Sequence, residues 1–381
     1  MPKYFNTTGP CFPRLHYMLP PKDRLVGASL ERYIRDELYW VLHAPRQTGK
    51  TTFLQSWMHE INAGTEAVAC YVSLEHCQEV TTVKRAMPAM AEAVREHAKR
   101  FHVPVPKYPS QVSPESMLSA LLIDWAAVAA PKKLIVLFDE VDVVAGPALV
   151  SFLRQLRSGF AGRGIGTFPV SVALVGMRDL RDYLVSSKDG RSLNPGSPFN
   201  IKHDSATLSN FSEADIAALT SQHSQATGQQ FAPEALERIW ACSSGQPWLV
   251  NALAYEMAWK DKTARDRTVD ITLQQYQAAR ERLIQSRATH LDQLADKLQE
   301  ARVRRTVSLL LSGEETGFQL PTDDLQYLED LGLIQRKPQV RIANRIYQEI
   351  IPRELTASTQ DTIVEQQEWY VDPDQRLNMN K

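Results

Sequence analysis

The sequence predicts an α/β protein whose core is a doubly wound parallel sheet, followed by an all-α lid and a winged-helix domain. Three observations support this fold class. Continuous apolar runs such as LIVLFDE at 134–140 alternate with helical patterns early in the chain. No strand-like run then appears for over a hundred residues after PFNIKHD. A helix pair and two short strands around Lys337-Pro338 come next.

The composition is that of an ordinary globular protein. The chain has 381 residues, 43% of them apolar and 23% charged, which indicates two or three folded units. Lys and Arg total 43 against 44 Asp and Glu, so the chain as a whole has no basic excess. Any site for a polyanion must therefore be formed by a local group of residues. The N-terminus lacks a signal-peptide pattern and no run is long enough to span a membrane. We therefore expect a cytoplasmic protein with no membrane partner.

The cysteines do not indicate a metal site. Cys11, Cys70, Cys77 and Cys242 lie far apart, without a CxxC pair or nearby histidine spacing. We expect them to be buried free thiols.

The elements of the α/β part can be read in order. The short apolar run in 36–42 predicts a buried strand, and a helix follows it, with apolar residues spaced for one face before Gly64. Pro88 is expected to kink or split the helix at 82–101. The other expected elements are strands at 68–74, 134–140 and 170–176 and helices at 114–130 and 147–160.

The rest of the chain is predicted to be mainly helical. Ser212 and Asp215 have the spacing of a capping box, and further helices are expected near Pro233 and Pro247. Later helices are expected at 271–288, 302–311 and 322–331. The predicted domains are a core at 1–205, a lid at 206–290, a winged helix at 291–355 and a polar linker or tail at 356–381.

A phosphate-binding loop lies between the first predicted strand and its helix. The eight residues match the P-loop pattern with alanine replacing the first glycine, a sterically mild change. Gly49 lets the backbone approach a phosphate, Lys50 supplies charge to the β- and γ-phosphates, and the Thr51 hydroxyl is a ligand for Mg²⁺. The expected nucleotide-binding residues are Ala44, Pro45, Arg46, Gln47, Thr48, Gly49, Lys50, Thr51 and Thr52.

Two acids follow the apolar run LIVLF. Ligands of open α/β sheets lie at the carboxyl ends of the strands, so Asp139 and Glu140 should face the phosphates. Asp139 is expected to orient the Mg²⁺ shell, and Glu140 to act as the general base that activates water. Catalysis is therefore assigned to Glu140 and Lys50. The alternative is an acidic strand end that caps the next helix.

With these motifs in place, the first part of the chain resembles the additional-strand, catalytic-glutamate class of P-loop ATPases. More narrowly, it is similar to the bacterial AAA-like and STAND-related ATPases. FPVSVALVGMRDLRDY resembles their sensor-1 strand, which implies a catalytic γ-phosphate sensor at Arg178. CSSGQPWLVNALA resembles the STAND-type GxP turn, which implies that Gly245 and Pro247 bring the lid to the adenine. The opening segment implies base contacts from Tyr17 and Pro20.

The resemblance extends to IANRIYQEIIPREL in the predicted winged helix. In such relatives a PD-(D/E)XK nuclease domain often follows a linker like EQQEWYVDPDQRLNMNK. The chain is then either a short relative or the ATPase half of a longer, nuclease-linked protein, and no nuclease activity is assigned to it.

Several side chains have a second interpretation. Arg178 alternatively forms an ion pair with Asp179 or Asp182. Ser73 either holds the catalytic glutamate, as the resemblance implies, or is a simple strand-end serine. His43, directly before the phosphate-binding loop, is expected to have a packing or capping role and no catalytic one. Three arginines either reach a neighbouring subunit as an arginine finger or lie on a solvated helix face, namely Arg154, Arg157 and Arg163.

The predicted winged helix is close to neutral. Residues 301–353 hold eight Lys or Arg and seven Asp or Glu, a net charge of 8 − 7 = +1. Phosphate contacts drive DNA affinity, so such a module binds DNA only if one face collects its basic residues. These residues are Arg302, Arg305, Arg336, Lys337 and Arg341. A structural or interaction module is the alternative.

Two functions follow. The first is an Mg²⁺-dependent switch ATPase in which ATP binding and turnover to ADP change the orientation of lid and winged helix. The second is an ATP-gated DNA-binding or scaffold protein with little hydrolysis, comparable to origin-recognition ATPases. A homo-oligomer or a partner protein fits both.

Overall fold

The computed structural model describes residues 3–78, 80–162, 168–178, 202–286, 296–312 and 320–367. These residues form two compact units. The α/β unit comprises Thr8–Pro13 and Met18–Asn210, and the helical unit comprises Met1–Thr7, Arg14–Tyr17 and Phe211–Lys381. The N-terminal segment, expected to belong wholly to the core, is thus shared between the two units.

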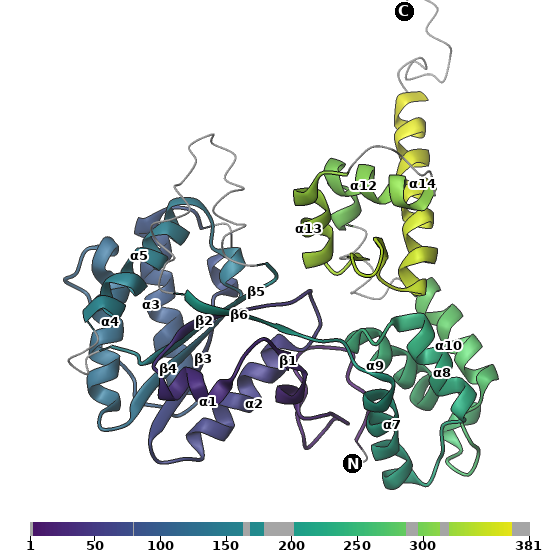
Figure 1. Cartoon of the computed structure of the whole chain (residues 1–381), viewed down its shortest axis with the longest axis horizontal. Coiled ribbons are helices and arrows are strands. Elements are labelled where there is room, and N and C mark those ends of the chain that lie inside the picture. Colours follow the sequence, from purple (N-terminus) through teal and green to yellow (C-terminus); the bar gives the residue numbers. More distant parts are fainter. Residues whose placement is uncertain are drawn as a thin grey trace, which may run out of the picture. The chain divides into compact units, whose positions relative to one another are not determined.

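The α/β unit is built on a six-stranded sheet with the order β1-β6-β2-β5-β4-β3 (Figure 1). The pairs β2–β5, β3–β4, β4–β5 and β2–β6 are parallel, with a register shift between Tyr39 and Trp40 in the β2–β6 pair, and the short β1 is antiparallel to its neighbour β6. The strands are β1 Leu25–Val26, β2 Tyr39–His43, β3 Ala67–Ser73, β4 Lys133–Asp139, β5 Ser171–Gly176 and β6 Lys202–Leu208. This mostly parallel sheet confirms the predicted fold class. Strand β5 lies between β2 and β4.

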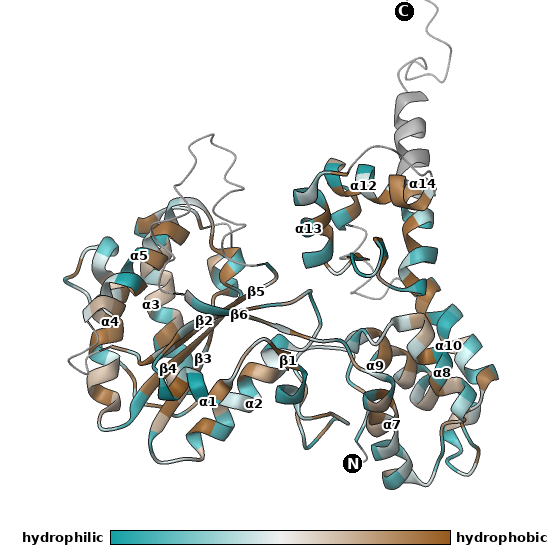
Figure 2. Ribbon diagram, viewed as in Figure 1, coloured by the Kyte–Doolittle hydropathy of each residue, from teal (hydrophilic) through white to brown (hydrophobic). Residues whose placement is uncertain are grey.

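Helices cover both faces of this sheet. On one face, α1 and α2 pack against strand residues such as Trp40 and Ile135. On the other, α3, α4 and α5 pack against strand residues such as Val41 and Val136. The helices are α1 Leu30–Arg35, α2 Lys50–Asn62, α3 Val83–Arg100, α4 Pro114–Ala129 and α5 Gly146–Gly162, with short turns η1 Pro21–Arg24, η2 Glu75–Cys77 and η3 Val141–Val143. Figure 2 shows the apolar strands enclosed between these layers.

The structure adds one strand to those expected in this unit and decides one of two alternatives for a helix. Strand β6 was missed because its sequence, KHDSATL, has no continuous apolar run and buries only Ala206 and Leu208 on alternate positions. Of the two outcomes expected at Pro88, a split is excluded, since α3 runs through the proline from Val83 to Arg100, and a kink stays a prediction. Extensive burial of the α3 face against the sheet compensates for the missing backbone hydrogen bond.

The helical unit begins with the predicted capping box, in which Ser212 and Asp215 bond each other's backbone at the start of α7. Its helices are α7 Glu213–Thr227, α8 Pro233–Ser243, α9 Pro247–Tyr255, the π-helix η5 Glu256–Lys260, η6 Thr263–Arg265, α10 Leu273–Gln285, α12 Ala301–Ser312, α13 Thr322–Asp330 and α14 Arg345–Gln367. Strands β7 Ile334–Gln335 and β8 Arg341–Ile342 form an antiparallel hairpin. Helix α14 continues past 356, where a polar linker was expected, and 368–381 lie outside the described residues.

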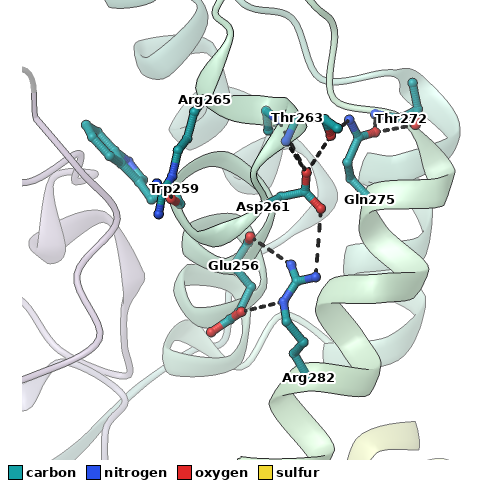
Figure 3. A network of polar contacts seen from close by, with 9 residues as sticks. Glu256, Trp259, Asp261, Thr263, Arg265, Thr272, Gln275 and Arg282 are labelled. Atoms are coloured by element: carbon teal, nitrogen blue, oxygen red, sulfur yellow. Dashed lines mark hydrogen bonds and ion pairs between the residues drawn. The ribbon is translucent and has the colours of Figure 1, made fainter.

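A polar network ties the π-helix to α10 (Figure 3). Glu256 is 5% exposed, so its charge needs a partner. Arg282 donates to its carboxylate at 3.0 Å and to its backbone carbonyl at 3.1 Å, and Lys260 lies 2.7 Å from the same carboxylate. Thr272 and Gln275 form a capping box that begins α10. These contacts give the buried Glu256 carboxylate two cationic partners where α9 ends.

The four cysteines are free thiols, with Cys11 partly exposed and the other three buried. Among the helices of the described residues, none has the length and apolar character needed to cross a membrane.

Candidate functional site

The predicted phosphate-binding loop lies between β2 and α2. Its first residue, Ala44, is 1% exposed and donates its N–H to the carbonyl of Gly176 at 3.3 Å, which fixes the loop to the end of β5. Gln47 and Gly49 have left-handed backbones, with φ of 57° and 94°. Alternation between right- and left-handed residues points successive N–H groups inward, which creates a concave site for an anion. Glycine suits the second of these positions because it adopts positive φ without strain.

Lys50 begins α2 and folds back over the loop. Its ammonium donates to the carbonyls of Ala44 at 2.7 Å and Pro45 at 2.9 Å. Loss of hydration lowers the pKa of Lys50, and the nearby carboxylates of Asp139, Asp142 and Glu140 oppose this shift. The three carboxylates favour the charged form of Lys50, and Lys50 begins α2, a helix whose N-terminus itself favours an anion.

Thr51 and Asp139 come together across the site. The Thr51 hydroxyl donates to Oδ2 of Asp139 at 2.7 Å, although 88 residues separate them in the chain. Asp139 is 1% exposed, and this burial raises the pKa of its carboxyl group. Hydrogen bonds from Thr51, from the Glu140 amide and from Tyr71 act in the opposite direction and lower that pKa. One hydroxyl and one carboxylate oxygen fit Mg²⁺, which keeps several waters and takes further oxygens from substrate phosphates. These two residues are the expected metal ligands.

Glu140 follows directly and has a left-handed backbone with φ of 59°. Such a backbone is uncommon in residues other than glycine and turns the side chain away from the strand direction. The Ser73 hydroxyl donates to Oε2 of Glu140 at 2.9 Å, so Ser73 holds this carboxylate as one interpretation anticipated. Burial raises the pKa of Glu140, while the Ser73 hydrogen bond lowers it. A raised pKa makes this carboxylate a stronger base than an exposed glutamate.

Arg178 follows β5, which pairs with both β2 and β4. It is 9% exposed, at the same end of the sheet as the loop and the two acids. Its alternative partners Asp179 and Asp182 lie outside the described residues, as does Arg163. Arg154 is exposed and Arg157 half-buried on α5, so their trans role stays a prediction.

The residues assigned to the adenine are placed in different units. Tyr17 is 1% exposed in the helical unit, where its ring lies 5.0 Å from that of Phe5 and 5.6 Å from that of His223. Pro247 is buried at the first position of α9 in the same unit. Pro20 precedes η1 in the α/β unit. Their contacts with a base stay a prediction.

Two residues of the site had no assignment from the sequence. Tyr71 on β3 directs its hydroxyl to Oδ2 of Asp139 at 3.3 Å. Arg24 donates to the carbonyl of Thr48 within the phosphate-binding loop. Tyr71 lies two residues before Ser73 and so faces the same side of its strand, which is a signal that could have found it. The segment PPKDRL offers no such signal for Arg24.

Three of the five basic residues singled out in the predicted winged-helix region have local contacts. The Arg302 guanidinium lies 3.4 Å from the centroid of the Tyr327 ring, and Arg336 donates to Gln326 at 2.8 Å. Arg341 bonds Gln335 across the hairpin at 2.9 Å. Arg341 and Lys337 remain exposed.

Comparison with known proteins supports the fold. Neither models of known protein families nor curated proteins match this sequence. Among solved structures, the Walker-type ATPase of Pyrococcus abyssi has a TM-score of 0.57 at 12% identity, covering 85% of this chain and 93% of that one. This similarity shows that the chain has a P-loop ATPase fold.

Two further structures are less similar. Cdc6p from Pyrobaculum aerophilum has a TM-score of 0.46 at 15% identity, with 86% of this chain and 91% of that one covered. The RuvB Holliday junction branch migration motor of Thermotoga maritima has a TM-score of 0.44 at 14% identity, with 84% and 91% covered. These TM-scores support no conclusion about this chain.

Proposed function

We propose that this chain binds ATP with Mg²⁺ and hydrolyses it to ADP and phosphate. The observation that carries the proposal is the 2.7 Å contact between Thr51 and Asp139. It joins the phosphate-binding loop to the carboxyl end of β4, beside a second carboxylate held for base catalysis. Ligands of open α/β sheets bind at this edge.

The residues divide the work of hydrolysis. The loop amides and Lys50 bind and orient the triphosphate, and Thr51 and Asp139 would hold Mg²⁺, which neutralises phosphate charge when bound. Glu140 accepts a proton from the attacking water, so that the water oxygen attacks the γ-phosphorus as the bond to the β-phosphate oxygen breaks. Arg178, which follows the strand between these groups, is proposed to contact the γ-phosphate as it leaves.

The finer proposal is a switch ATPase of AAA-like or STAND type. The backbone passes between the two units after residues 7, 13, 17 and 210, so four covalent connections link them. The N-terminal segment that contains two of these crossings contacts a predicted nucleotide-binding residue, because the Cys11 amide donates to the Thr52 hydroxyl at 3.0 Å. We propose that nucleotide state alters the lid and winged-helix orientation through these crossings, with Tyr17, Pro20 and Pro247 near the adenine.

ATP affinity tests the binding proposal. Lys50→Ala should weaken binding of ATP strongly, since it removes the cation that reaches the β- and γ-phosphates. Lys22→Ala is the matched control, because Lys22 is an exposed lysine of the same unit, paired with Glu60 at 2.9 Å. Equal affinity in wild type and Lys50→Ala, measured by titration, contradicts the loop assignment.

ATP-gated DNA binding is the second candidate, favoured by the exposed Lys337 and Arg341 on the β7–β8 hairpin. It predicts a mobility shift of duplex DNA that requires ATP and weakens as salt is added. Absence of a shift at low salt removes this candidate.

A further inference from the structure

Arg24 is buried against the phosphate-binding loop. It ends η1, immediately before β1, and is 8% exposed. One terminal nitrogen of its guanidinium donates to the Thr48 carbonyl at 2.5 Å. A Cβ atom placed on Gly49 would lie 3.5 Å from the other terminal nitrogen, so the side-chain-free backbone of Gly49 lies against the guanidinium. Arg24 thus bonds Thr48 and lies on the side of Gly49 that a Cβ would occupy, so it adjoins both residues that precede Lys50.

The arginine is itself held in place by Ser209. Its Nε donates to the Ser209 carbonyl at 2.9 Å. In return, the Arg24 carbonyl accepts from the Ser209 amide at 2.9 Å and from the Ser209 hydroxyl at 3.2 Å. The adjoining β1–β6 pairing, Leu25 with Leu208, continues this ladder. The guanidinium is therefore a fixed donor, because both its stem and its backbone are anchored.

A fixed donor at the Thr48 carbonyl sets the direction of the next amide. The peptide group between Thr48 and Gly49 is planar and trans, so its C=O and N–H point in opposite directions. The carbonyl faces Arg24, and the Gly49 N–H therefore points away from Arg24. The hydroxyl of Thr48 donates to the Pro45 carbonyl at 2.9 Å, which stabilises the same orientation of the loop.

We propose that Arg24 is a positioning residue for phosphate binding: it fixes the Thr48–Gly49 peptide so that the Gly49 N–H is presented to a phosphate oxygen. The proposal rests on the proposed function. Its ligand is a triphosphate oxygen, and Arg24 acts through the backbone without touching it. Lysine cannot replace it, because one ammonium cannot reach both the Thr48 and Ser209 carbonyls as a planar fork does.

The first test separates binding from chemistry. Arg24→Met keeps an apolar stem and removes the donors, and should raise the Kd and KM for ATP about tenfold, since hydrogen bonds from charged groups are among the stronger ones. The kcat should stay within about threefold, because Glu140 and its Ser73 contact are untouched. Arg24→Lys should resemble Arg24→Met. Arg32→Met, an exposed arginine of the same unit, should match wild type.

A second measurement does not depend on turnover. In protein labelled with ¹⁵N-glycine and free of nucleotide, the Gly49 amide resonance is identified by its loss in Gly49→Ala. It should move in Arg24→Met and Arg24→Lys and stay in place in Arg32→Met, with thermal unfolding checking that each variant folds. Arg24→Lys preserves the test if Arg24→Met does not fold.

The outcomes are distinguishable. An unmoved Gly49 resonance, or unchanged ATP affinity in both Arg24 variants, overturns the inference even if wild type hydrolyses ATP. A fall in kcat with unchanged KM also overturns it, because that pattern indicates general damage. If the resonance moves as expected while wild type binds neither ATP nor inorganic tripolyphosphate, the loop geometry stands and the proposed function fails.

Discussion

Glu140→Gln removes the proposed base with little change of shape. Glutamine is isosteric with glutamate, and its amide oxygen can still accept a hydrogen bond from the Ser73 hydroxyl, which lies 2.9 Å from Oε2. The backbone φ of 59° is equally strained for glutamine and glutamate. The substitution therefore deletes basicity and charge, and leaves the position of the side chain intact.

The expected loss follows from that single change. General-base catalysis contributes about 10²–10⁴-fold to rate, so kcat should fall by that factor, equivalent to roughly 2.7–5.4 kcal/mol in the barrier. ATP affinity should be retained or increased, because a negative charge beside the phosphates disappears. Thermal stability should not fall, because burial already raises the pKa of Glu140 and so disfavours its charged form.

The assay is phosphate release at saturating ATP and Mg²⁺, with ATP affinity measured in parallel. Glu66→Gln is the matched control, because Glu66 is an exposed glutamate of the same unit and is not among the charges that shift the pKa of Glu140. Wild-type turnover in Glu140→Gln would refute the base assignment. Loss of ATP binding in that variant would refute the claim that its shape is preserved.

Three further outcomes are expected. Ser73→Ala removes the hydrogen bond that lowers the pKa of Glu140, so the acidic limb of the kcat profile should move to higher pH; an unmoved limb counts against the contact. Asp139→Asn should abolish turnover. It should also raise the melting temperature at neutral pH, because burial raises the pKa of Asp139 and its charged form costs stability once the pH exceeds that pKa. Melting curves at several pH values should show that this gain in melting temperature vanishes in acid. Gly245→Ala would place a Cβ 1.9 Å from the Phe211 carbonyl oxygen, at a φ of +71°, and should lower the free energy of unfolding in denaturant by about 3 kcal/mol or more. In Gly228→Ala, φ is +82° but no atom lies within 4 Å of the new Cβ, so the free energy of unfolding should fall by only about 1–2 kcal/mol. Equal losses for the two glycines would contradict the close approach.

The site motifs could be predicted because they are local in sequence. A strand, a turn and a helix N-terminus follow one another from Tyr39 to Thr51, and the apolar run before Asp139 fixes the end of a buried strand. Parallel strands place the carboxyl ends of β2 and β4 at the same edge of the sheet, so the proximity of Thr51 and Asp139 follows from these two local patterns.

The missing parts depend on tertiary contacts that leave no local pattern. Strand β6 pairs with β2 from Lys202 to Ala206 but carries mostly polar residues, so neither an apolar run nor an alternating pattern is strong. Arg24 resembles any surface cation in a segment rich in charge, and only folding buries it against Thr48. The division of the N-terminal segment between two units follows from its contacts with residues more than two hundred positions away, such as the 2.8 Å bond from Trp248 to the Thr7 carbonyl.

The most direct test of the central claim is Mg²⁺-dependent phosphate release from ATP by wild type and by Thr51→Val. Valine matches threonine in shape and lacks only the hydroxyl that contacts Asp139. The account predicts steady release by wild type that stops when Mg²⁺ is chelated and falls at least tenfold in Thr51→Val. Release that persists without Mg²⁺, or that is equal in the two proteins, would contradict it.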